Sequence, residues 1–453
     1  MSLLRSIICV CIGIMVDTGI GFGEDETGQS TVKLTPTGFA SYEIGQVVKA
    51  NPQTPPSRDF QTDHLLFQKS FVGFNLLTSY DPLPISTNIG VELKSFTETP
   101  RSTLVSGDLG TAVRFFYFFY LSRADFIYSH SEGFNLDVGY FPIKYDDNAR
   151  NLGEYLFRSG TYPQYLITNF DFAAARVTGI NAFGTLFSNF NYKTLLTINT
   201  EGATMGDLNF TGIASYAVLN KFLEFGGGFS FCSFISANPN HTHPPKNDVN
   251  NLADWYVVNN KDTATYTFAG TKLMGRLSID PKAFFPSDIL GKEDLKLYAE
   301  AAILGVKSYP VSVDTSSLAT RYDDIAKRIP IMFGVNVPTF KLLDVLSLEA
   351  EWFGSPYPND MTNYVVWGNP SSISRKWIGG NGSSIYADST ANNWKWSIYA
   401  KKTLAGHFNI VFQVASDHYR WEKYGYSDQT LMLTEALTQP RHFYYVGKLG
   451  YSF

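Results

Sequence analysis

Residues 442–453 read HFYYVGKLGYSF, and their side chains alternate between two kinds. Successive residues of a β-strand point to opposite faces, so this stretch predicts a strand with one apolar and one polar face. The same alternation recurs around Phe408–Val414, Leu346–Trp352 and Trp394–Ile398. In the terminal stretch the apolar face carries Phe443, Tyr445, Gly447, Leu449, Tyr451 and Phe453, and the other face carries His442, Lys448, Gly450 and Ser452.

The composition indicates an outer surface that meets lipid rather than water. Charged residues make up 17% of the chain and aromatic residues 15%, whereas a soluble domain usually carries about 25% charged residues. The formal net charge is −5, with 36 Lys and Arg against 41 Asp and Glu. Because nucleic-acid binding favours a strongly basic face, we expect no nucleic-acid partner.

The N-terminus has the pattern of a cleaved secretory signal peptide over residues 1–23. Arg5 precedes the short apolar run Ile7–Val16, and small residues stand just before Glu24. The run is too short for a spanning helix, which needs roughly 20 apolar residues. A lipoprotein modified at Cys11 is the less favoured alternative, because no lipoprotein box surrounds it.

No other stretch of the chain is long and apolar enough to be a transmembrane helix. A closed β-barrel is the remaining way for a secreted, lipid-facing chain to cross a bilayer. Cleavage of the signal peptide would leave Cys232 as the single cysteine, so we expect no internal disulfide.

Alternating segments along the chain predict an all-β fold, a transmembrane antiparallel up-and-down barrel of about sixteen strands. We expect a short N-terminal segment over 24–31 and one barrel over 32–453. The predicted strands are 33–48, 65–79, 87–97, 115–128, 134–144, 171–186, 190–200, 207–219, 222–236, 264–279, 295–308, 328–338, 345–354, 393–403, 407–419 and 442–453.

The connections between these strands alternate in length. Most of those after even-numbered strands are short turns, and most of those after odd-numbered strands are long. Bacterial barrels have short periplasmic turns and long external loops, so this register places both termini on the periplasmic side. The turn over 280–294 is an exception because it is long for its side, and it has room for a helical piece. The long connections are 49–64, 98–114, 145–170, 237–263, 309–327, 355–392 and 420–441.

The last residues also resemble a targeting signal. An aromatic final residue preceded by apolar residues at alternate positions is similar to the signal by which the outer-membrane insertion machinery recognises barrel substrates. Tyr451 and Phe453 carry that resemblance here. It implies that the insertion machinery and outer-membrane lipid are partners of this chain.

In strand count and loop alternation the chain resembles the general porins, whose third external loop folds inward and narrows the pore. This resemblance is architectural. The third long loop here carries charges of both signs, which in a narrow path orient dipolar solutes and set a weak ion preference. A surface loop that simply meets water is the alternative. The predicted constriction residues are Lys144, Asp146, Asp147, Arg150, Glu154 and Arg158.

Strand alternation also predicts which charged side chains face the lumen. Charges there can be solvated, whereas charges facing lipid at the bilayer centre cost several kcal/mol. Both signs are present, so no strong filter for anions or cations is implied. The predicted lumen-lining residues are Glu92, Lys94, Asp137, Arg176, Lys193, Glu224, Lys272, Arg276, Glu300, Glu349, Glu351, Lys395 and Lys401.

Two other residue patterns bear on function. His241 and His243 have the spacing of a metal pair, but no ligand cluster accompanies them, so we expect a polar loop tip. Exposed aromatic residues in the long loops suit glycan binding or packing of the loops against each other equally well. They are Trp255, Tyr256, Trp367, Trp377 and Tyr386.

Enzymatic function has little support in the sequence. Asp417 and His418 form the nearest candidate pair for a lipid-active barrel, but no hydrolase motif accompanies them. We therefore expect no enzyme.

Taken together, the patterns predict a porin-like channel of the bacterial outer membrane for passive diffusion of small hydrophilic solutes. Barrels of 16 to 18 strands leave an aqueous channel. We expect no cofactor and no metal, and the resemblance is consistent with a homotrimer. The alternative function is a barrel whose long loops, 237–263 and 355–392, bind an extracellular polysaccharide or partner.

Overall fold

A computed structural model gives the fold of the chain. It describes residues 31–50, 64–99, 114–158, 175–200, 204–237, 255–258, 262–265, 269–285, 287–306, 325–353, 394–419, 437 and 439–453. The predicted signal peptide, the two histidines of the 237–263 loop and the 355–392 loop lie outside these residues. Within them, no helix is both long enough and apolar enough to cross a membrane.

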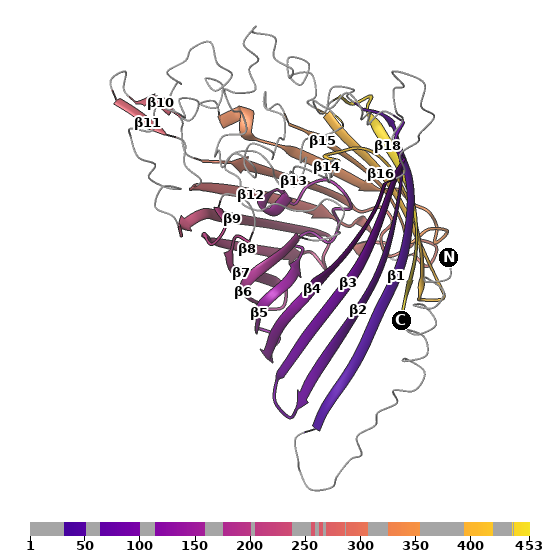
Figure 1. Cartoon of the computed structure of the whole chain (residues 1–453), viewed down its shortest axis with the longest axis horizontal. Helices are drawn as coiled ribbons and strands as arrows, with labels where there is room; N and C mark the ends of the chain where they lie inside the picture. Colours follow the sequence, from indigo (N-terminus) through magenta and orange to yellow (C-terminus); the bar gives the residue numbers. More distant parts are fainter. Residues whose placement is uncertain are drawn as a thin grey trace.

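Sixteen antiparallel strands form one closed barrel, as the sequence predicts (Figure 1). Each strand pairs with its neighbours in sequence, and β1 pairs with β18 from Phe39 opposite Ser452 to Lys49 opposite Phe443. The strands are β1 Thr31–Lys49, β2 Leu66–Asp81, β3 Ile85–Thr99, β4 Arg114–Ser131, β5 Phe134–Ile143, β6 Ala175–Leu186, β7 Phe190–Ile198, β8 Leu208–Val218, β9 Leu223–Ile235, β12 Gly270–Ile279, β13 Leu297–Leu304, β14 Ile331–Asn336, β15 Val345–Trp352, β16 Trp394–Leu404, β17 Phe408–Ser416 and β18 Phe443–Ser452.

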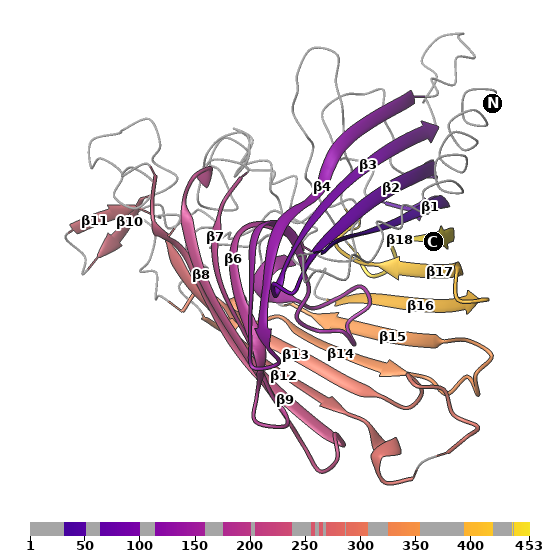
Figure 2. The ribbon, with the colours of Figure 1, turned by 90° about the horizontal axis from the view of Figure 1, so that it is seen from below.

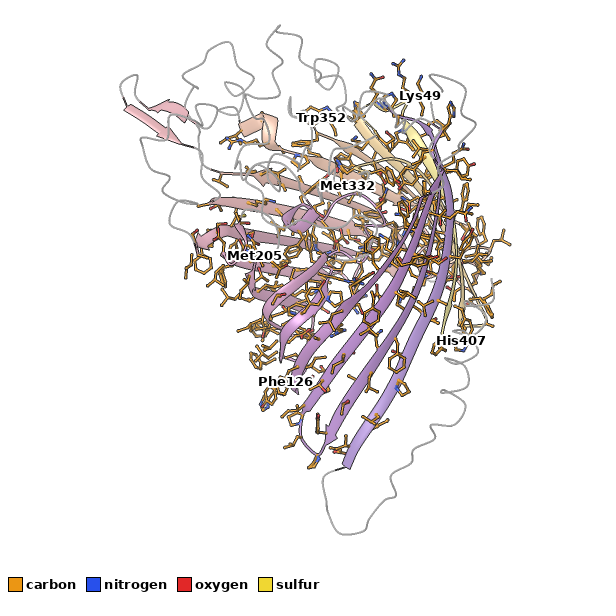
Figure 3. The ribbon with its side chains drawn as sticks, viewed as in Figure 1. Lys49, Phe126, Met205, Met332, Trp352 and His407 are labelled. Carbon is orange, nitrogen blue, oxygen red and sulfur yellow. The ribbon has the colours of Figure 1, made fainter. Side chains whose placement is uncertain are left out.

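The alternation that predicts the strands also sets which face of each strand is turned outward. In β18, Tyr445 and Leu449 are exposed, whereas Tyr444 and Val446, on either side of Tyr445, are buried. Around the barrel, Phe126 projects outward while Met332 lies inside (Figure 3). The outer surface is therefore apolar, and the buried polar and charged side chains lie on the inner face of the strands.

The structure corrects where two of the predicted strands begin. Residues Asp262–Thr265 (β11) pair with Trp255–Val258 (β10) in a separate two-stranded sheet, so the predicted strand 264–279 begins only at Gly270. The predicted strand 328–338 is shorter, because Ile325–Arg328 forms a 3₁₀ turn (η6) before β14.

The long turn between β12 and β13 holds the helical piece that its length predicts. Pro281–Ala283 forms a 3₁₀ helix (η4) whose N-cap, Asp280, accepts a hydrogen bond from the Lys282 N–H. Proline is favoured at the first helical position because it has no N–H to leave unsatisfied.

The wall of the barrel is uneven. Strands β1 to β4, here called the tall wall, have 19, 16, 15 and 18 residues. Strands β13 to β15, the short wall, have 8, 6 and 8 residues. The two walls lie across the barrel from each other, as the view from below shows (Figure 2).

Candidate functional site

The segment over residues 144–158, which follows β5, leaves the barrel wall and is called the inner loop. It ends in the short helix α2, Tyr155–Arg158. The Glu154 carboxylate accepts the N–H groups of Tyr145 at 2.9 Å and Asp146 at 3.0 Å, which closes the loop on itself. Asp146 in turn accepts the Asn148 N–H at 3.0 Å, a local turn typical of Asp.

The inner loop crosses the lumen and meets β15, which is eight strands away from β5 in either direction round the barrel. Glu349 of β15 accepts three consecutive main-chain N–H groups of the loop: Arg150 at 2.6 Å, Asn151 at 2.9 Å and Leu152 at 2.9 Å. One buried carboxylate therefore fixes a whole turn of the loop.

A second carboxylate on the short wall holds the end of the loop. Glu300 of β13 accepts the N–H groups of Glu154 and Tyr155, both at 2.9 Å, and the Tyr145 hydroxyl at 2.7 Å. Gly153, with φ +85°, lies between these contacts. This φ lies in the left-handed region that favours glycine, and a Cβ there would stand 2.6 Å from the end of the Met332 side chain, which would have to move.

A third carboxylate, Glu351 of β15, contacts both the loop and the residues that follow β17. It accepts the Tyr155 hydroxyl at 2.8 Å and lies 2.7 Å from Nε2 of His418. Nearby, Asp417 accepts Nδ2 of Asn151 at 2.6 Å and the Tyr444 hydroxyl at 2.8 Å. We call Glu300, Glu349 and Glu351 the socket glutamates, because each receives donors from the loop.

The tyrosines of the loop are suited to this donor role. Burial raises the pKa of Tyr145 well above its ordinary value, and the negative charge of Glu300 raises it further. Burial and the charge of Glu351 likewise raise the pKa of Tyr155. Both hydroxyls therefore stay protonated and donate to the carboxylates over the whole physiological pH range.

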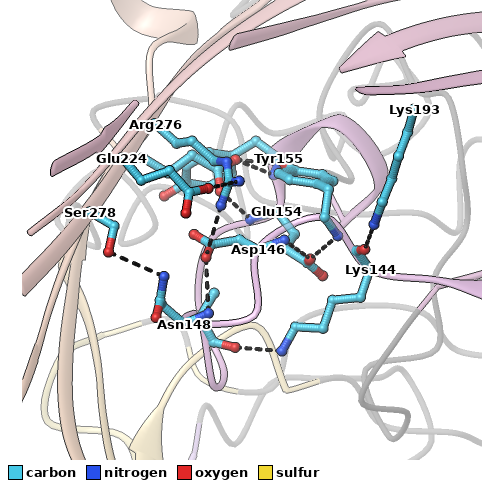
Figure 4. A network of polar contacts seen from close by, with 12 residues as sticks. Lys144, Asp146, Asn148, Glu154, Tyr155, Lys193, Glu224, Arg276 and Ser278 are labelled. Atoms are coloured by element: carbon cyan, nitrogen blue, oxygen red, sulfur yellow. Dashed lines mark hydrogen bonds and ion pairs between the residues drawn. The ribbon is translucent and has the colours of Figure 1, made fainter. Parts of the chain in front are cut away.

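Basic side chains of the wall complete the network (Figure 4). Arg276 of β12 lies 3.3 Å from Asp146 and 2.6 Å from Glu224, so it joins the loop to β9. Lys193 of β7 donates to the Lys144 carbonyl at 2.6 Å. The loop is therefore held by main-chain contacts on both of its sides.

Apolar side chains of the loop fill the space between it and the wall. Leu152, Leu156 and Phe157 are almost fully buried. They belong to one cluster with inward-facing residues of β5 to β9 and β12 to β14, including Leu195 and Met332. Burying a side chain of this size contributes about 1.5–3 kcal/mol, so packing adds substantially to the polar contacts.

The six predicted constriction residues have different surroundings. Asp146 and Glu154 are buried and hold the loop, whereas Asp147 is exposed. Lys144 donates to the Ala149 carbonyl, and Arg150 forms an ion pair with Glu293 at 2.9 Å. The Arg158 side chain lies outside the described residues. A role of this set in narrowing a pore stays a prediction.

The predicted lumen-lining residues lie on the strand face opposite the exposed apolar side chains. On the tall wall, Glu92 pairs with Arg176 at 2.7 Å, and Lys94 lies over the rings of Phe71 and Phe96. On the other strands the set includes Lys272 and Arg276 of β12 and the three socket glutamates. Whether these residues line a conducting path stays a prediction.

Sequence reasoning missed several partners because their side chains are not charged. Tyr298 donates to Glu349 at 2.8 Å, and Tyr120 donates to Glu92 at 2.6 Å. Strand alternation places both tyrosines on the inner face, and this pattern could have identified them as partners of the inward carboxylates. Tyr145 and Tyr155 were missed in the same way.

The pair considered for catalysis, Asp417 and His418, is engaged in holding the inner loop through Asn151 and Glu351. Among the residues whose placement is described, no three His, Cys, Asp or Glu side chains gather as metal ligands do. Of the loop aromatics, Trp255 and Tyr256 belong to β10, and Trp367, Trp377 and Tyr386 lie outside the described part of the chain.

The terminal residue closes the barrel seam. The main-chain N–H and carbonyl of Phe453 both bond to Gly38 at 3.0 Å, and the Phe453 ring lies over Gly38, where a Cβ would stand 2.4 Å from it. Tyr451 and Phe453 are each 40% exposed on the outer face. Their role as an assembly signal stays a prediction.

No protein-family model matches the chain, and no curated protein matches its sequence. Among solved structures, the chain is similar to a triple mutant of the porin from Rhodopseudomonas blastica, with 8% identity and a TM-score of 0.42, over 93% of this chain and 100% of that one. A structure described as an engineered protein with asymmetric conductivity matches with 10% identity, a TM-score of 0.40 and the same coverage. Similarity this low establishes neither a family nor a function.

Proposed function

We propose that the chain is a channel of the bacterial outer membrane that lets small hydrophilic solutes diffuse passively. The observation that carries this proposal is a closed barrel of sixteen strands that exposes apolar side chains and turns polar and ionisable ones inward. Only helices and closed barrels satisfy their backbone polar groups in hydrocarbon. Barrels of this strand number are wide enough to hold an aqueous path.

The inner loop is proposed to be the narrowest part of that path. It is held across the lumen by the socket glutamates, and contacts to both sides leave it little freedom to swing away. Size therefore limits passage first, and the charges of both signs around the loop tune it second.

The inner face of β1 supports a wider entrance at the turn end. Along this face Thr37 is exposed, Ser41 is half-buried, and Glu43 and Val47 are buried. Solvent therefore reaches the inner wall more freely at the end where the short turns lie.

Localisation and assembly belong to the same proposal. Residues 1–23 would direct secretion, Tyr451 and Phe453 would be recognised by the insertion machinery, and outer-membrane lipid would surround the barrel. A homotrimer is compatible with this function. No enzymatic activity and no cofactor are part of the proposal.

Reconstitution of the purified protein in a planar lipid bilayer tests the proposal. We expect stepwise increases of current, and a reversal potential in a salt gradient that shows only weak ion preference. A bilayer that stays sealed while the protein is shown to be inserted contradicts the channel.

A double variant, Glu300→Gln with Glu349→Gln, tests the part played by the inner loop. Each amide turns an NH₂ group toward the N–H donors of the loop, so the loop should loosen and the open-channel current should become larger and noisier. Glu132→Gln, in the exposed turn between β4 and β5, is the matched control and should leave the current unchanged.

A further inference from the structure

Three neighbouring turns at the end of the barrel that holds the short turns expose several large apolar side chains, and single ones are exposed elsewhere at this end, such as Leu83 and Phe187. The three turns join β8 to β9, β12 to β13, and β14 to β15, and we call their exposed apolar surface the ledge. The exposed fractions are 61% for Leu219, 59% for Phe284, 51% for Phe285, 66% for Ile289, 60% for Phe340 and 78% for Leu342.

The three turns are bonded to each other and form one surface. The rings of Phe222 and Phe284 lie 4.6 Å apart, and the Asp280 N–H donates to the Phe222 carbonyl at 2.8 Å. The buried Asp294 carboxylate accepts the N–H groups of Thr339 and Phe340, each at 3.2 Å. These contacts hold the three turns together, so the exposed apolar side chains form one ordered surface.

The ledge lies at the end of the short wall where the turns join its strands. A transmembrane strand needs about 9–11 residues to cross the hydrocarbon, whereas β13, β14 and β15 have 8, 6 and 8. Their outward side chains, such as Phe333 at 59% and Leu348 at 39% exposure, form part of the apolar outer surface. The strands alone are too short to span the bilayer on this side, and the ledge continues their apolar surface.

Basic side chains accompany the apolar ones in these turns. Lys221, Lys292 and Lys341 are exposed, and Lys402 of β16 pairs with Asp344 at 3.5 Å. Lysine beside large apolar side chains is typical of segments in the interfacial layer of a membrane, where the ammonium group meets anionic headgroups. The turn between β4 and β5 differs, because it presents Ser131, Glu132 and Gly133.

We propose that the ledge is a lipid-binding surface embedded in the interfacial layer of the leaflet on the turn side. The apolar side chains contact acyl chains near the headgroups, and the lysines bind anionic headgroups. The bilayer thereby covers the wall that its strands are too short to span. This inference rests on the proposed insertion of the barrel in a membrane, and it accounts for the unusual length of the turn between β12 and β13.

Fluorescent labelling in lipid vesicles tests the proposal. An environment-sensitive thiol probe is attached at Leu342→Cys or Phe284→Cys, with Cys9, Cys11 and Cys232 replaced by serine. The full barrel is reconstituted in vesicles of phosphatidylcholine and phosphatidylglycerol. Two sites serve as controls. Phe412→Cys, at 51% exposure on the outer face of β17, reports contact with lipid, and Glu132→Cys in the polar turn reports contact with water.

Lipids brominated near the headgroup should quench both ledge probes, and aqueous iodide should quench the Glu132→Cys probe alone. Ledge probes quenched by iodide as strongly as the one at position 132 would place the ledge in water and overturn the proposal. Ledge probes shielded from both quenchers would indicate a protein partner and overturn it equally. If the Phe412→Cys probe is not quenched by lipid brominated along the acyl chain, the membrane insertion itself is wrong, so the two failures are distinguishable.

Discussion

The tall wall and the short wall of the barrel are stabilised in different ways. On the tall wall, β1 and β2 are paired along sixteen positions, whereas on the short wall β13 and β14 are paired along five. Inward-facing charges of the tall wall pair mainly with other side chains, as Glu43 does with Lys448 at 2.9 Å. On the short wall, Glu300 and Glu349 instead accept main-chain N–H groups of the inner loop.

This difference shows how a wall of short strands is held. Fewer ladder hydrogen bonds connect its strands, and the inner loop supplies contacts that bridge β13 and β15 from within the lumen. The inner loop and the short wall therefore stabilise each other, whereas the tall wall is stabilised by the hydrogen bonds between its own strands.

The largest expected effect is a difference in stability between two matched variants, one on each wall. Glu349→Gln leaves buried N–H groups of the loop facing an amide NH₂, and should lower the free energy of unfolding by about 2 kcal/mol. Glu43→Gln removes a pair in which Lys448 is 31% exposed, and should cost no more than about 1 kcal/mol. Urea titration of the refolded barrels measures both. Equal costs would mean that the loop does not depend on the short wall.

A second pair of variants compares two glycines that lie beneath aromatic rings. A Cβ at Gly334 would stand 2.1 Å from the Tyr298 ring, and one at Gly73 would stand 2.2 Å from the Phe39 ring. Tyr298 is held by Ser347 and Glu349, whereas Phe39 is only partly buried and can turn aside. Gly334→Ala should therefore cost about 2 kcal/mol, and Gly73→Ala less than about 1 kcal/mol, in the same titration. The reverse order would show that Tyr298 is not fixed.

The smallest expected effect concerns Asp344, at the foot of the short wall. Burial would raise its pKa, but hydrogen bonds from Thr403 and the charge of Lys402 outweigh burial and hold the pKa below the ordinary value of 3.8. A depressed pKa in the folded state stabilises the fold above the unfolded pKa, and this contribution is lost as the pH falls through the folded pKa.

Asp344→Asn should therefore destabilise the barrel slightly at neutral pH, by about 0.5 kcal/mol or less, because the pair with Lys402 is partly exposed and screened. The difference from the natural sequence should disappear in acid, below the folded pKa. Unfolding measured at neutral and at acid pH checks this. A difference that grows on acidification contradicts the assigned direction.

The fold follows closely from the sequence because strand alternation has a short, local period. Each of the sixteen predicted strands overlaps a strand of the barrel, and turns such as Asn220-Lys221 and Ala405-Gly406 fall where one strand ends and the next begins. Boundaries fail where a segment pairs locally, as Asp262–Thr265 does with Trp255–Val258. The unequal height of the wall was not predicted, since the alternation continues past the last paired residue.

The site was predicted in its parts but not in its connections. Alternation places Glu300, Glu349 and Glu351 on the inner face, and the count of loops singles out residues 145–170. That Glu349 accepts the Arg150 N–H, 199 residues away in sequence, depends on the closure of the whole barrel. Local patterns hold no information on such a contact. The sequence therefore predicts that the loop charges face the pore, but it does not predict their partners on the barrel wall.

Cross-linking between the inner loop and the far wall tests the account most directly. Nδ2 of Asn148 lies 3.3 Å from Oγ of Ser278 on β12, five strands from β5, while Ser41 on β1 is four strands away in the other direction. With Cys9, Cys11 and Cys232 replaced by serine, a short bifunctional thiol reagent should link Asn148→Cys to Ser278→Cys and leave Asn148→Cys with Ser41→Cys unlinked. A link to position 41, or none to position 278 in a folded barrel, would contradict a loop fastened across the lumen.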